Sequence, residues 1–292
     1  MLSILIPTHE YYCDELVRAL ADDARGIDEP VEMIVCSDGS SAAFDEELQR
    51  RLTAIEGADV KFMRTGGHLG PARTRNLLAR ESRGELLLFI DADAELAEKG
   101  FLARHIADAP DADVVCGALK NPDSMPPGHE LRMRYERAAE PRRSAEWRNM
   151  HPYENFTPFN VLIHRRAFED LQFDERCKEY GYEDALYGLQ LKEEGISILH
   201  TDNALIHRGI DTNESFLRKT ETALRTLSHL GEPMQSHAGA SRMCRKLGKW
   251  GLLPLLRVAF RLTKPLLLRN LRGKRPNLRL FNFYKLGYYA LL

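Results

Sequence analysis

The most constraining feature of the sequence is a short apolar run that ends in two aspartates. Residues 84–95 read Gly-Glu-Leu-Leu-Leu-Phe-Ile-Asp-Ala-Asp-Ala-Glu, so Asp91 and Asp93 follow five consecutive apolar residues. Such a run is typical of a strand buried in the middle of a sheet, and open α/β sheets bind ligands beyond the carboxyl ends of these strands. Two carboxylates there suit Mg²⁺ or Mn²⁺, which in turn can hold a diphosphate. An ordinary acidic turn is the alternative.

Strand-like and helix-like patterns alternate along the chain, which predicts βαβ units and a mostly parallel sheet. Residues 120–155 are less regular, and we expect a lid or an insertion on the acceptor side there. The predicted strands are 2–6, 31–36, 60–63, 86–90, 113–119, 159–163, 196–199 and 204–206, and the predicted helices are 15–25, 44–55, 71–81, 183–194 and 214–230.

Charge is distributed unevenly in this chain of 292 residues. The net charge is −2, but residues 233–292 contain 13 Lys and Arg and no Asp or Glu, whereas residues 1–232 carry −15. The five cysteines include no Cys-x-x-Cys pair, which predicts reduced thiols rather than disulfides or zinc. The first residues read as a strand and not as a signal peptide, so we expect a cytoplasmic protein.

Polar loops follow three of the predicted strands. They are Pro7-Thr8-His9-Glu10, Asp38-Gly39-Ser40-Ser41 and Asp91-Ala92-Asp93. Because the carboxyl ends of parallel strands lie along one edge of a sheet, we expect these loops to converge. Each loop could be an ordinary turn by itself, so the prediction of a site depends on all three together.

These segments together resemble the inverting glycosyltransferases of family 2, which have a GT-A fold. The matching segments are 3–8, 37–40, 70–76, the Asp91/Asp93 pair and 181–184. The resemblance covers about residues 1–230, and it departs from the family pattern at Ser37, where the family often has a second Asp, and at His9.

The resemblance implies an α/β fold with a Rossmann-like, mostly parallel sheet flanked by helices. It places a GT-A domain at 1–232, made of a nucleotide-sugar-binding half (1–119) and an acceptor half (120–232). A basic, amphipathic helical extension at 233–292 follows this domain.

The resemblance also implies a donor site for a UDP-sugar. Asp38 would accept a hydrogen bond from the uracil ring, and Arg75, or alternatively Arg73, would lie near the base or the diphosphate. Asp91 would contact the ribose or the metal, and Asp93 would ligate Mn²⁺ or Mg²⁺ directly. A solvated helix face is the alternative for both arginines. The implied nucleotide-binding residues are Pro7, Thr8, Glu10, Asp38, Arg73, Arg75 and Asp91.

A second carboxylate pair, Glu183 and Asp184, opens a predicted helix. Inverting transfer needs one carboxylate as the general base, and by resemblance this is Asp184, with Glu183 orienting the acceptor, although the two roles could be reversed. Favourable interaction with the helix N-terminus is the alternative explanation for both. His207 follows a short predicted strand and, by resemblance, would complete the metal shell, although a structural histidine is the alternative.

The basic extension mixes cations with large apolar residues. Trp250, Leu253, Leu256 and Phe260 share one predicted helix face, and Arg257, Arg261 and Lys264 share another. This pattern predicts peripheral binding to the anionic inner face of the plasma membrane, with Pro254 and Pro265 breaking the helix into short pieces. Packing against the body or a second subunit, as in a homodimer, is the alternative, and we do not expect nucleic-acid binding.

We therefore expect a metal-dependent inverting transferase that moves a sugar from a UDP-sugar to an acceptor hydroxyl. The expected acceptor is a glycan or lipid-linked glycan in surface polysaccharide, lipopolysaccharide or glycolipid assembly. A nucleotidyltransferase would need a Gly-rich loop and a lysine after the first strand, and His9-Glu10-Tyr11-Tyr12 offers neither. A non-catalytic membrane adaptor that keeps the fold is the other alternative.

Overall fold

The computed structural model describes residues 1–177, 180–232 and 234–292. They form two compact units. The described parts of the first unit are 1–122, 141–177 and 183–209, and those of the second are 123–140, 180–182, 210–232 and 234–292.

This grouping differs from the predicted division after residue 232. The reason is that helix α9 (Asn213–Leu230) packs with α13 (Leu278–Leu291) inside the second unit, where Arg225 Nη1 donates to Tyr288 Oη at 2.8 Å. Residue 233, the first of the predicted extension, lies outside the described residues.

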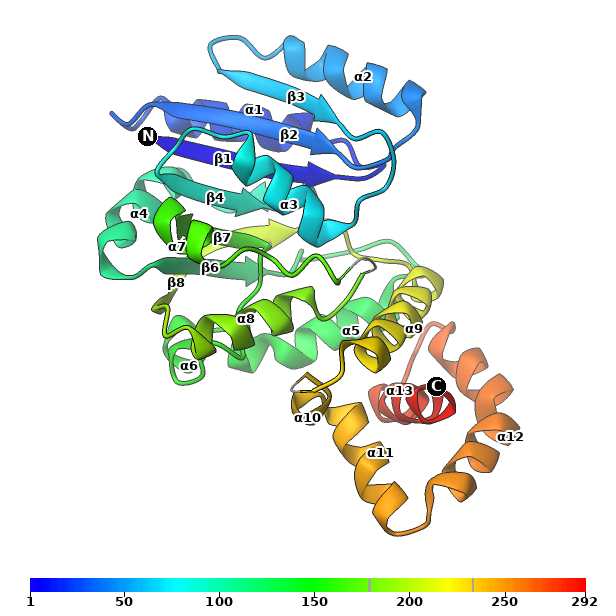
Figure 1. Cartoon of the computed structure of the whole chain (residues 1–292). Coiled ribbons are helices and arrows are strands. Elements are labelled where there is room, and N and C mark those ends of the chain that lie inside the picture. Colours follow the sequence, from blue (N-terminus) through cyan, green and yellow to red (C-terminus); the bar gives the residue numbers. More distant parts are fainter. Residues whose placement is uncertain (178–179, 233) are drawn as a thin grey trace. The chain divides into compact units, whose positions relative to one another are not determined.

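The first unit is built on an eight-stranded sheet, counted over the described residues, in the order β3-β2-β1-β4-β7-β6-β8-β5 (Figure 1). Strand pairs β3-β2, β2-β1, β1-β4 and β6-β8 are parallel, whereas β7 and β5 run antiparallel to their neighbours. The predicted α/β class with a mostly parallel sheet is confirmed. The strands are β1 Leu2–Thr8, β2 Val31–Ser37, β3 Val60–Arg64, β4 Leu86–Ile90, β5 Ala94–Leu96, β6 Val114–Lys120, β7 Asn160–His164 and β8 Ile198–His207.

The apolar run before the aspartate pair forms β4, between β1 and β7. Leu87, Leu88, Phe89 and Ile90 are all fully buried, because both faces of the strand are covered. Burial of apolar surface is the main favourable contribution to folding, so this strand holds the Asp91–Asp93 loop on a rigid base. The helices of this unit are α1 Asp14–Ala24, α2 Ala42–Thr53, α3 Pro71–Arg80, α4 Phe101–Asp108, α6 Ala145–Asn149, α7 Arg165–Asp170 and α8 Glu183–Glu193.

The strand directions place the predicted site residues at one edge of the sheet. β1, β2, β4 and β8 run in the same direction, so their carboxyl ends lie together. The loops after β1, β2 and β4 begin at this edge, and His207 ends β8 there. The predicted convergence of the three polar loops is therefore supported by the topology.

Several predicted elements differ from the structure. The two strands expected at 196–199 and 204–206 are one strand, β8, which pairs with β6 through a register shift between Cys116 and Ala118. Neither β5 nor α4 was predicted. The region 120–155, predicted to be irregular, contains the helices α5 (Glu130–Ala139) and α6.

The second unit is helical. Its core joins Phe216 of α9 to Phe260, Phe281 and Tyr284, and Figure 1 shows α13 flanked by α11 and α12. Helix α13 approaches α12 closely at Gly287, where a Cβ would lie 2.3 Å from Phe260 Cδ2. The helices of this unit are α5, α9, α10 Met234–His237, α11 Gly239–Lys249, α12 Leu253–Leu271 and α13.

Two predictions for the extension are wrong. Helix α12 is continuous, because Pro254 lies in its first turn, where no intrahelical N–H bond is lost, and Pro265 is accommodated inside it. The predicted membrane-facing residues Leu256 and Phe260 are buried in the core of this unit, because they pack there with the neighbouring helices.

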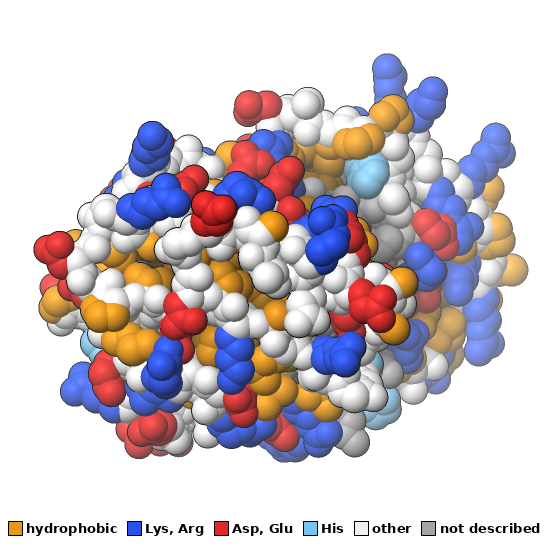
Figure 2. All heavy atoms as spheres, turned by 90° about the horizontal axis from the view of Figure 1, so that it is seen from above, with side chains coloured by type: hydrophobic (Ala, Val, Ile, Leu, Met, Phe, Trp, Pro, Cys, Tyr) orange, Lys and Arg blue, Asp and Glu red, His pale blue; other side chains and the backbone are white. Residues whose placement is uncertain are grey.

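Within the described residues, no helix is both long enough and apolar enough to cross a bilayer. The face shown in Figure 2 has Lys and Arg side chains interspersed with Asp and Glu, and apolar side chains between them.

Candidate active site

The loops after β1 and β2 are bound to each other. Glu10 Oε1 accepts a hydrogen bond from the Ser41 amide at 2.6 Å, and Ser40 Oγ accepts one from the Glu10 amide at 3.0 Å. The hydrogen bond from Ser41 lowers the pKa of Glu10, and Glu10 has a φ of 50°, which is uncommon for a residue with a side chain. Thr8 is buried and donates to Tyr11 O at 2.6 Å, so its hydroxyl is turned to its own loop.

Asp38 is engaged by the loop before α3. Its carboxylate accepts hydrogen bonds from the amides of Leu69 (2.7 Å) and Gly70 (2.9 Å), and His68 Nδ1 lies 3.0 Å from Oδ2. Gly39, with a φ of 65°, permits this approach, since a Cβ there would lie 2.6 Å from the His68 amide nitrogen. Asp38 therefore fixes the loop at 68–70. If Asp38 also accepted a hydrogen bond from uracil, its carboxylate would have to bind the base and these loop donors at the same time.

The two arginines of α3 point to different partners. Arg75 is 5% exposed, and its Nη2 donates to Asp91 Oδ1 at 2.5 Å. Arg73, which is more exposed, pairs instead with Glu175 at 3.3 Å. The structure thus brings Arg75, and not Arg73, to the aspartate loop.

Asp93 lies against β8. Its Oδ2 is 3.2 Å from His207 Nε2, and its carbonyl accepts the Arg208 amide at 2.8 Å. Ala94, the next residue, is the cross-strand neighbour of His207 in the β5–β8 pair. Gly209 completes the arrangement, because a Cβ there would lie 1.8 Å from Asp93 Oδ2.

Tyr11 also belongs to this part of the site. Partial burial and the nearby charge of Asp93 both raise the pKa of Tyr11, while Arg208 opposes the shift. Neither Tyr11 nor Gly209 was predicted as a site residue. The sequence signal for Gly209 was only its place after His207-Arg208, and no pattern showed that β5 would place Asp93 beside it.

Asp184 is half-buried in the first turn of α8, and its Oδ1 accepts the Ala185 amide at 2.7 Å. Burial raises the pKa of Asp184, Arg75 opposes this shift, and Asp91 adds to it. The charges of Arg75 and Asp91 therefore both act on the Asp184 carboxyl group. Glu183 precedes Asp184 in the same turn.

The described residues contain no group of three or more His, Cys, Asp and Glu side chains that could hold a metal by itself. The Asp93–His207 pair nevertheless offers a carboxylate oxygen and an imidazole nitrogen, and His207 Nδ1 is buried without a hydrogen-bond partner. Mg²⁺ sites that bind phosphates often use only one or two protein ligands. The pair fits a divalent cation of this kind, whereas Asp91 is paired with Arg75.

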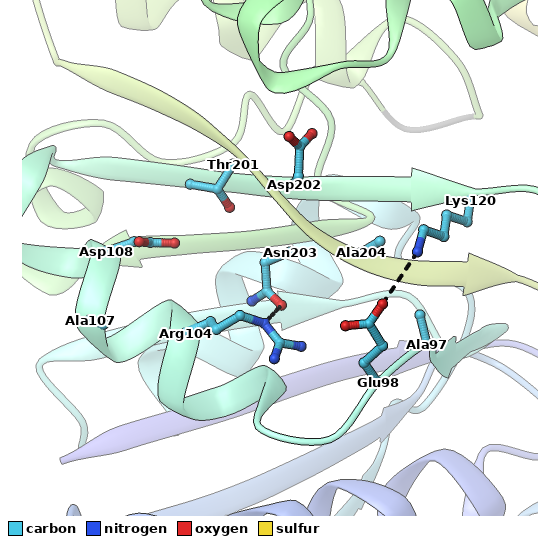
Figure 3. Close-up of a pocket in the computed structure, with 10 residues that line it drawn as sticks. All are labelled: Ala97, Glu98, Arg104, Ala107, Asp108, Lys120, Thr201, Asp202, Asn203 and Ala204. Atoms are coloured by element: carbon cyan, nitrogen blue, oxygen red, sulfur yellow. Dashed lines mark hydrogen bonds and ion pairs between the residues drawn. The ribbon is translucent and has the colours of Figure 1, made fainter.

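A separate cavity of about 330 Å³ lies between α4, β6 and β8 in the first unit (Figure 3). None of the predicted site residues lines it. Its cations have partners, since Arg104 Nε donates to Asn203 Oδ1 at 2.9 Å and Lys120 lies 3.7 Å from Glu98. This cavity therefore adds nothing to the aspartate site.

Comparison with known families decides which family the chain belongs to. The profile described as "Glycosyl transferase family 2" matches residues 3–172, more than half of the chain. The chain belongs to glycosyl transferase family 2. As a family 2 member with a GT-A-like fold, it is a nucleotide-sugar-dependent glycosyltransferase. Among curated proteins, none matches the chain.

Solved structures share this family 2 fold. The mannosyltransferase PcManGT from Pyrobaculum calidifontis, in complex with GDP-Man and Mn²⁺, has a TM-score of 0.57 at 14% identity, over 99% of this chain and 84% of that one. Glucosyl-3-phosphoglycerate synthase from Mycobacterium tuberculosis, with Mn²⁺, UDP and glucosyl-3-phosphoglycerate, has a TM-score of 0.53 at 16% identity, over 78% and 79%. S. aureus TarS 1–349 with UDP-GlcNAc has a TM-score of 0.51 at 19% identity, over 78% and 66%.

Proposed function

We propose that this chain is an inverting, metal-dependent glycosyltransferase that moves a sugar from a UDP-sugar to an acceptor hydroxyl. The observation that carries the proposal is that the loop after β4 presents two ordered carboxylates, Asp91 bound to Arg75 and Asp93 beside His207. The acceptor would be a glycan or lipid-linked glycan in surface polysaccharide, lipopolysaccharide or glycolipid assembly.

Asp93 and His207 are the residues that would hold Mn²⁺ or Mg²⁺. A bound divalent cation would stabilise the negative charge that develops on the diphosphate as it leaves. Arg75 would add a guanidinium on the same leaving group, and Asp91 would keep that guanidinium oriented through their hydrogen bond.

Asp184 would act as the general base. The acceptor oxygen attacks the anomeric carbon, its proton passes to an Asp184 oxygen, and the bond to the diphosphate breaks with its electron pair leaving on the nucleotide. The raised pKa of Asp184 suits this role, because the best proton acceptors have pKa values close to the working pH. Glu183 would orient the acceptor, and it is the alternative base.

The donor nucleotide would lie over the loops after β1 and β2, which carry Pro7, Thr8, Glu10 and Asp38. The bonds that join these loops support a preformed pocket. Structural neighbours contain either a guanosine or a uridine nucleotide, so the base is the first property to be tested.

The test measures release of nucleoside diphosphate from UDP-glucose, UDP-galactose, UDP-GlcNAc and GDP-mannose with Mn²⁺. Turnover of a UDP-sugar that is lost in Asp93→Ala and strongly reduced in Asp184→Asn would support the proposal. Asp28→Asn, an exposed aspartate outside the site, is the matched control. A folded wild-type protein inert with every donor would favour a non-catalytic adaptor, and turnover of GDP-mannose alone would refute the UDP assignment.

A further inference from the structure

Helix α12 has two apolar faces. Leu256, Phe260, Leu267 and Leu271 are at most 9% exposed and form part of the core of the second unit. A second set of apolar residues recurs at helical spacing on another side of α12. More than half of the surface of each of these residues is exposed: 66% for Leu255, 51% for Val258, 75% for Leu262 and 68% for Leu266.

The segment directly before α12 also exposes large apolar side chains. Trp250 is 61% exposed and Leu252 is 42% exposed, and Lys246 Nζ lies 4.8 Å from the centre of the Trp250 ring. We call this surface the α12 apolar face, and define it as Trp250, Leu252, Leu255, Val258, Leu262 and Leu266. Isolated exposed apolar residues need no explanation, but a contiguous set of large ones marks an interaction surface.

The segment that carries the α12 apolar face is strongly basic, because residues 233–292 contain 13 Lys and Arg and no Asp or Glu. Two of these cations pair with acids outside this segment, Arg245 with Glu232 and Arg272 with Glu214. Over the described part of the chain, the others have no carboxylate partner among the salt bridges. The exposed cations of α11 and α12 outside those pairs are Arg242, Lys246, Lys249, Arg257, Arg261 and Arg269.

We propose that the α12 apolar face docks on the surface of an anionic lipid bilayer. The leucines would enter the boundary between headgroups and acyl chains, Trp250 would lie at headgroup depth, and the cations would contact lipid phosphates. This face is not the one predicted from the sequence, since Leu256 and Phe260 are buried. The inference goes beyond the transferase reaction and does not depend on it.

The charge pattern favours lipid over a second copy of the chain. A two-fold contact through the α12 apolar face would bring two acid-free, basic segments together and leave their charges unneutralised. An anionic membrane neutralises the cations and accepts the apolar side chains in one step.

The test is co-sedimentation of the full chain with two kinds of vesicle. One kind contains phosphatidylcholine alone, and the other contains phosphatidylcholine with 30 mol% phosphatidylglycerol, about one lipid in three, to resemble an anionic leaflet. We expect binding to the anionic vesicles that weakens as salt is raised. Leu262→Gln/Leu266→Gln should lower the partition coefficient about tenfold or more, and Arg261→Gln/Arg269→Gln about 25-fold, at roughly fivefold per cation.

The matched controls lie in the first unit. Met150→Gln removes a 61% exposed apolar side chain, and Arg18→Gln/Arg25→Gln removes two exposed cations, so both should bind as the wild type does. Equal binding by the α12 and control variants would overturn the proposal. Sedimentation velocity without vesicles tests the alternative partner. If it shows a concentration-dependent dimer, and Leu262→Gln/Leu266→Gln abolishes that dimer, the α12 apolar face binds a second copy of the chain instead. Nucleotide release without acceptor reports separately on the proposed catalytic function.

Discussion

Arg75 Nη2 and Asp91 Oδ1 are joined by a hydrogen-bonded ion pair of 2.5 Å, and the Arg75 side chain is only 6% exposed. A guanidinium this deeply buried needs an anionic partner. The same pair leaves Asp91 one-third exposed at the end of β4, so it links the core of the sheet to the site. A substitution of Asp91 should therefore change both the stability of the fold and the chemistry of the site.

Asp91→Asn should reduce both stability and activity. It leaves the buried Arg75 without its counter-charge, and since Asp91 is partly exposed we expect a loss of about 1–2 kcal/mol in the free energy of unfolding. Urea denaturation measures the loss, and nucleotide release measures the effect on turnover. Lys61→Gln breaks an exposed pair with Glu81 and should change stability by less than about 1 kcal/mol. Equal effects of the two variants would contradict the structural role of Asp91.

Asp184→Asn should lower turnover by about 10²- to 10⁴-fold, the usual contribution of a general base. In the wild type, the rate should rise with pH through the raised pKa of Asp184, because only the ionised carboxylate accepts the proton. A pH–rate profile of kcat/KM measures this rise, which is the acidic limb of the profile. If Glu183→Gln, and not Asp184→Asn, removes the limb, the two roles are reversed.

The same pKa shift predicts a stability difference with a defined sign. Folding raises the pKa of Asp184 above the value of about 3.9 in unfolded chains. At pH values between the unfolded and the folded pKa, the folded state therefore binds more protons than the unfolded state. The stability of the wild type falls as the pH rises through this range. Asp184→Asn abolishes this dependence. Its thermal midpoint should exceed that of the wild type at pH 8 and match it near pH 4, and the opposite order would be incompatible with a raised pKa.

The strands other than β5, and the three loops, could be predicted because each depends on local sequence, although β8 was predicted as two strands. The run Leu86–Ile90 is apolar throughout, and its two faces are buried as the pattern requires. Partner choice was not predictable in the same way. Nothing in residues 94–96 shows that they pair with β8, and the choice of Arg75 over Arg73 depends on where the rest of the fold places Asp91 and Glu175.

The extension illustrates the same limit. Helical periodicity finds apolar stripes, but it does not tell which stripe is covered by the rest of the protein. Phe260 was expected to face lipid, whereas Gly287 lets α13 pack directly against its ring. The exposed stripe through Leu262 was visible only once the core was known.

Asp38→Asn should loosen the loop before α3. The carboxylate accepts the amides of Leu69 and Gly70, and an asparagine has only one acceptor oxygen to replace two. We expect these two amides to exchange with solvent about tenfold faster or more, which corresponds to the roughly 1.5–3 kcal/mol of a hydrogen bond to a charged group. Hydrogen–deuterium exchange of peptides covering 65–70 measures this. Unchanged protection would show that Asp38 does not hold the loop.

Gly209→Ala tests whether Asp93 is held in place by the segment that follows β8. The added Cβ would lie 1.8 Å from Asp93 Oδ2 and 2.6 Å from Asp93 Cβ, so the Asp93 side chain must shift from its place beside Gly209. Misplacement of a site group by about 1 Å commonly costs around 100-fold in rate, and metal affinity should fall as well. Titration of Mn²⁺ by its own EPR signal, together with nucleotide release, separates lost metal binding from lost turnover. Gly248→Ala in α11, where a Cβ meets nothing within 4 Å, is the control and should stabilise the protein by about 0.4–1 kcal/mol. Normal Mn²⁺ affinity and turnover in Gly209→Ala would mean that Asp93 and His207 do not form the metal site.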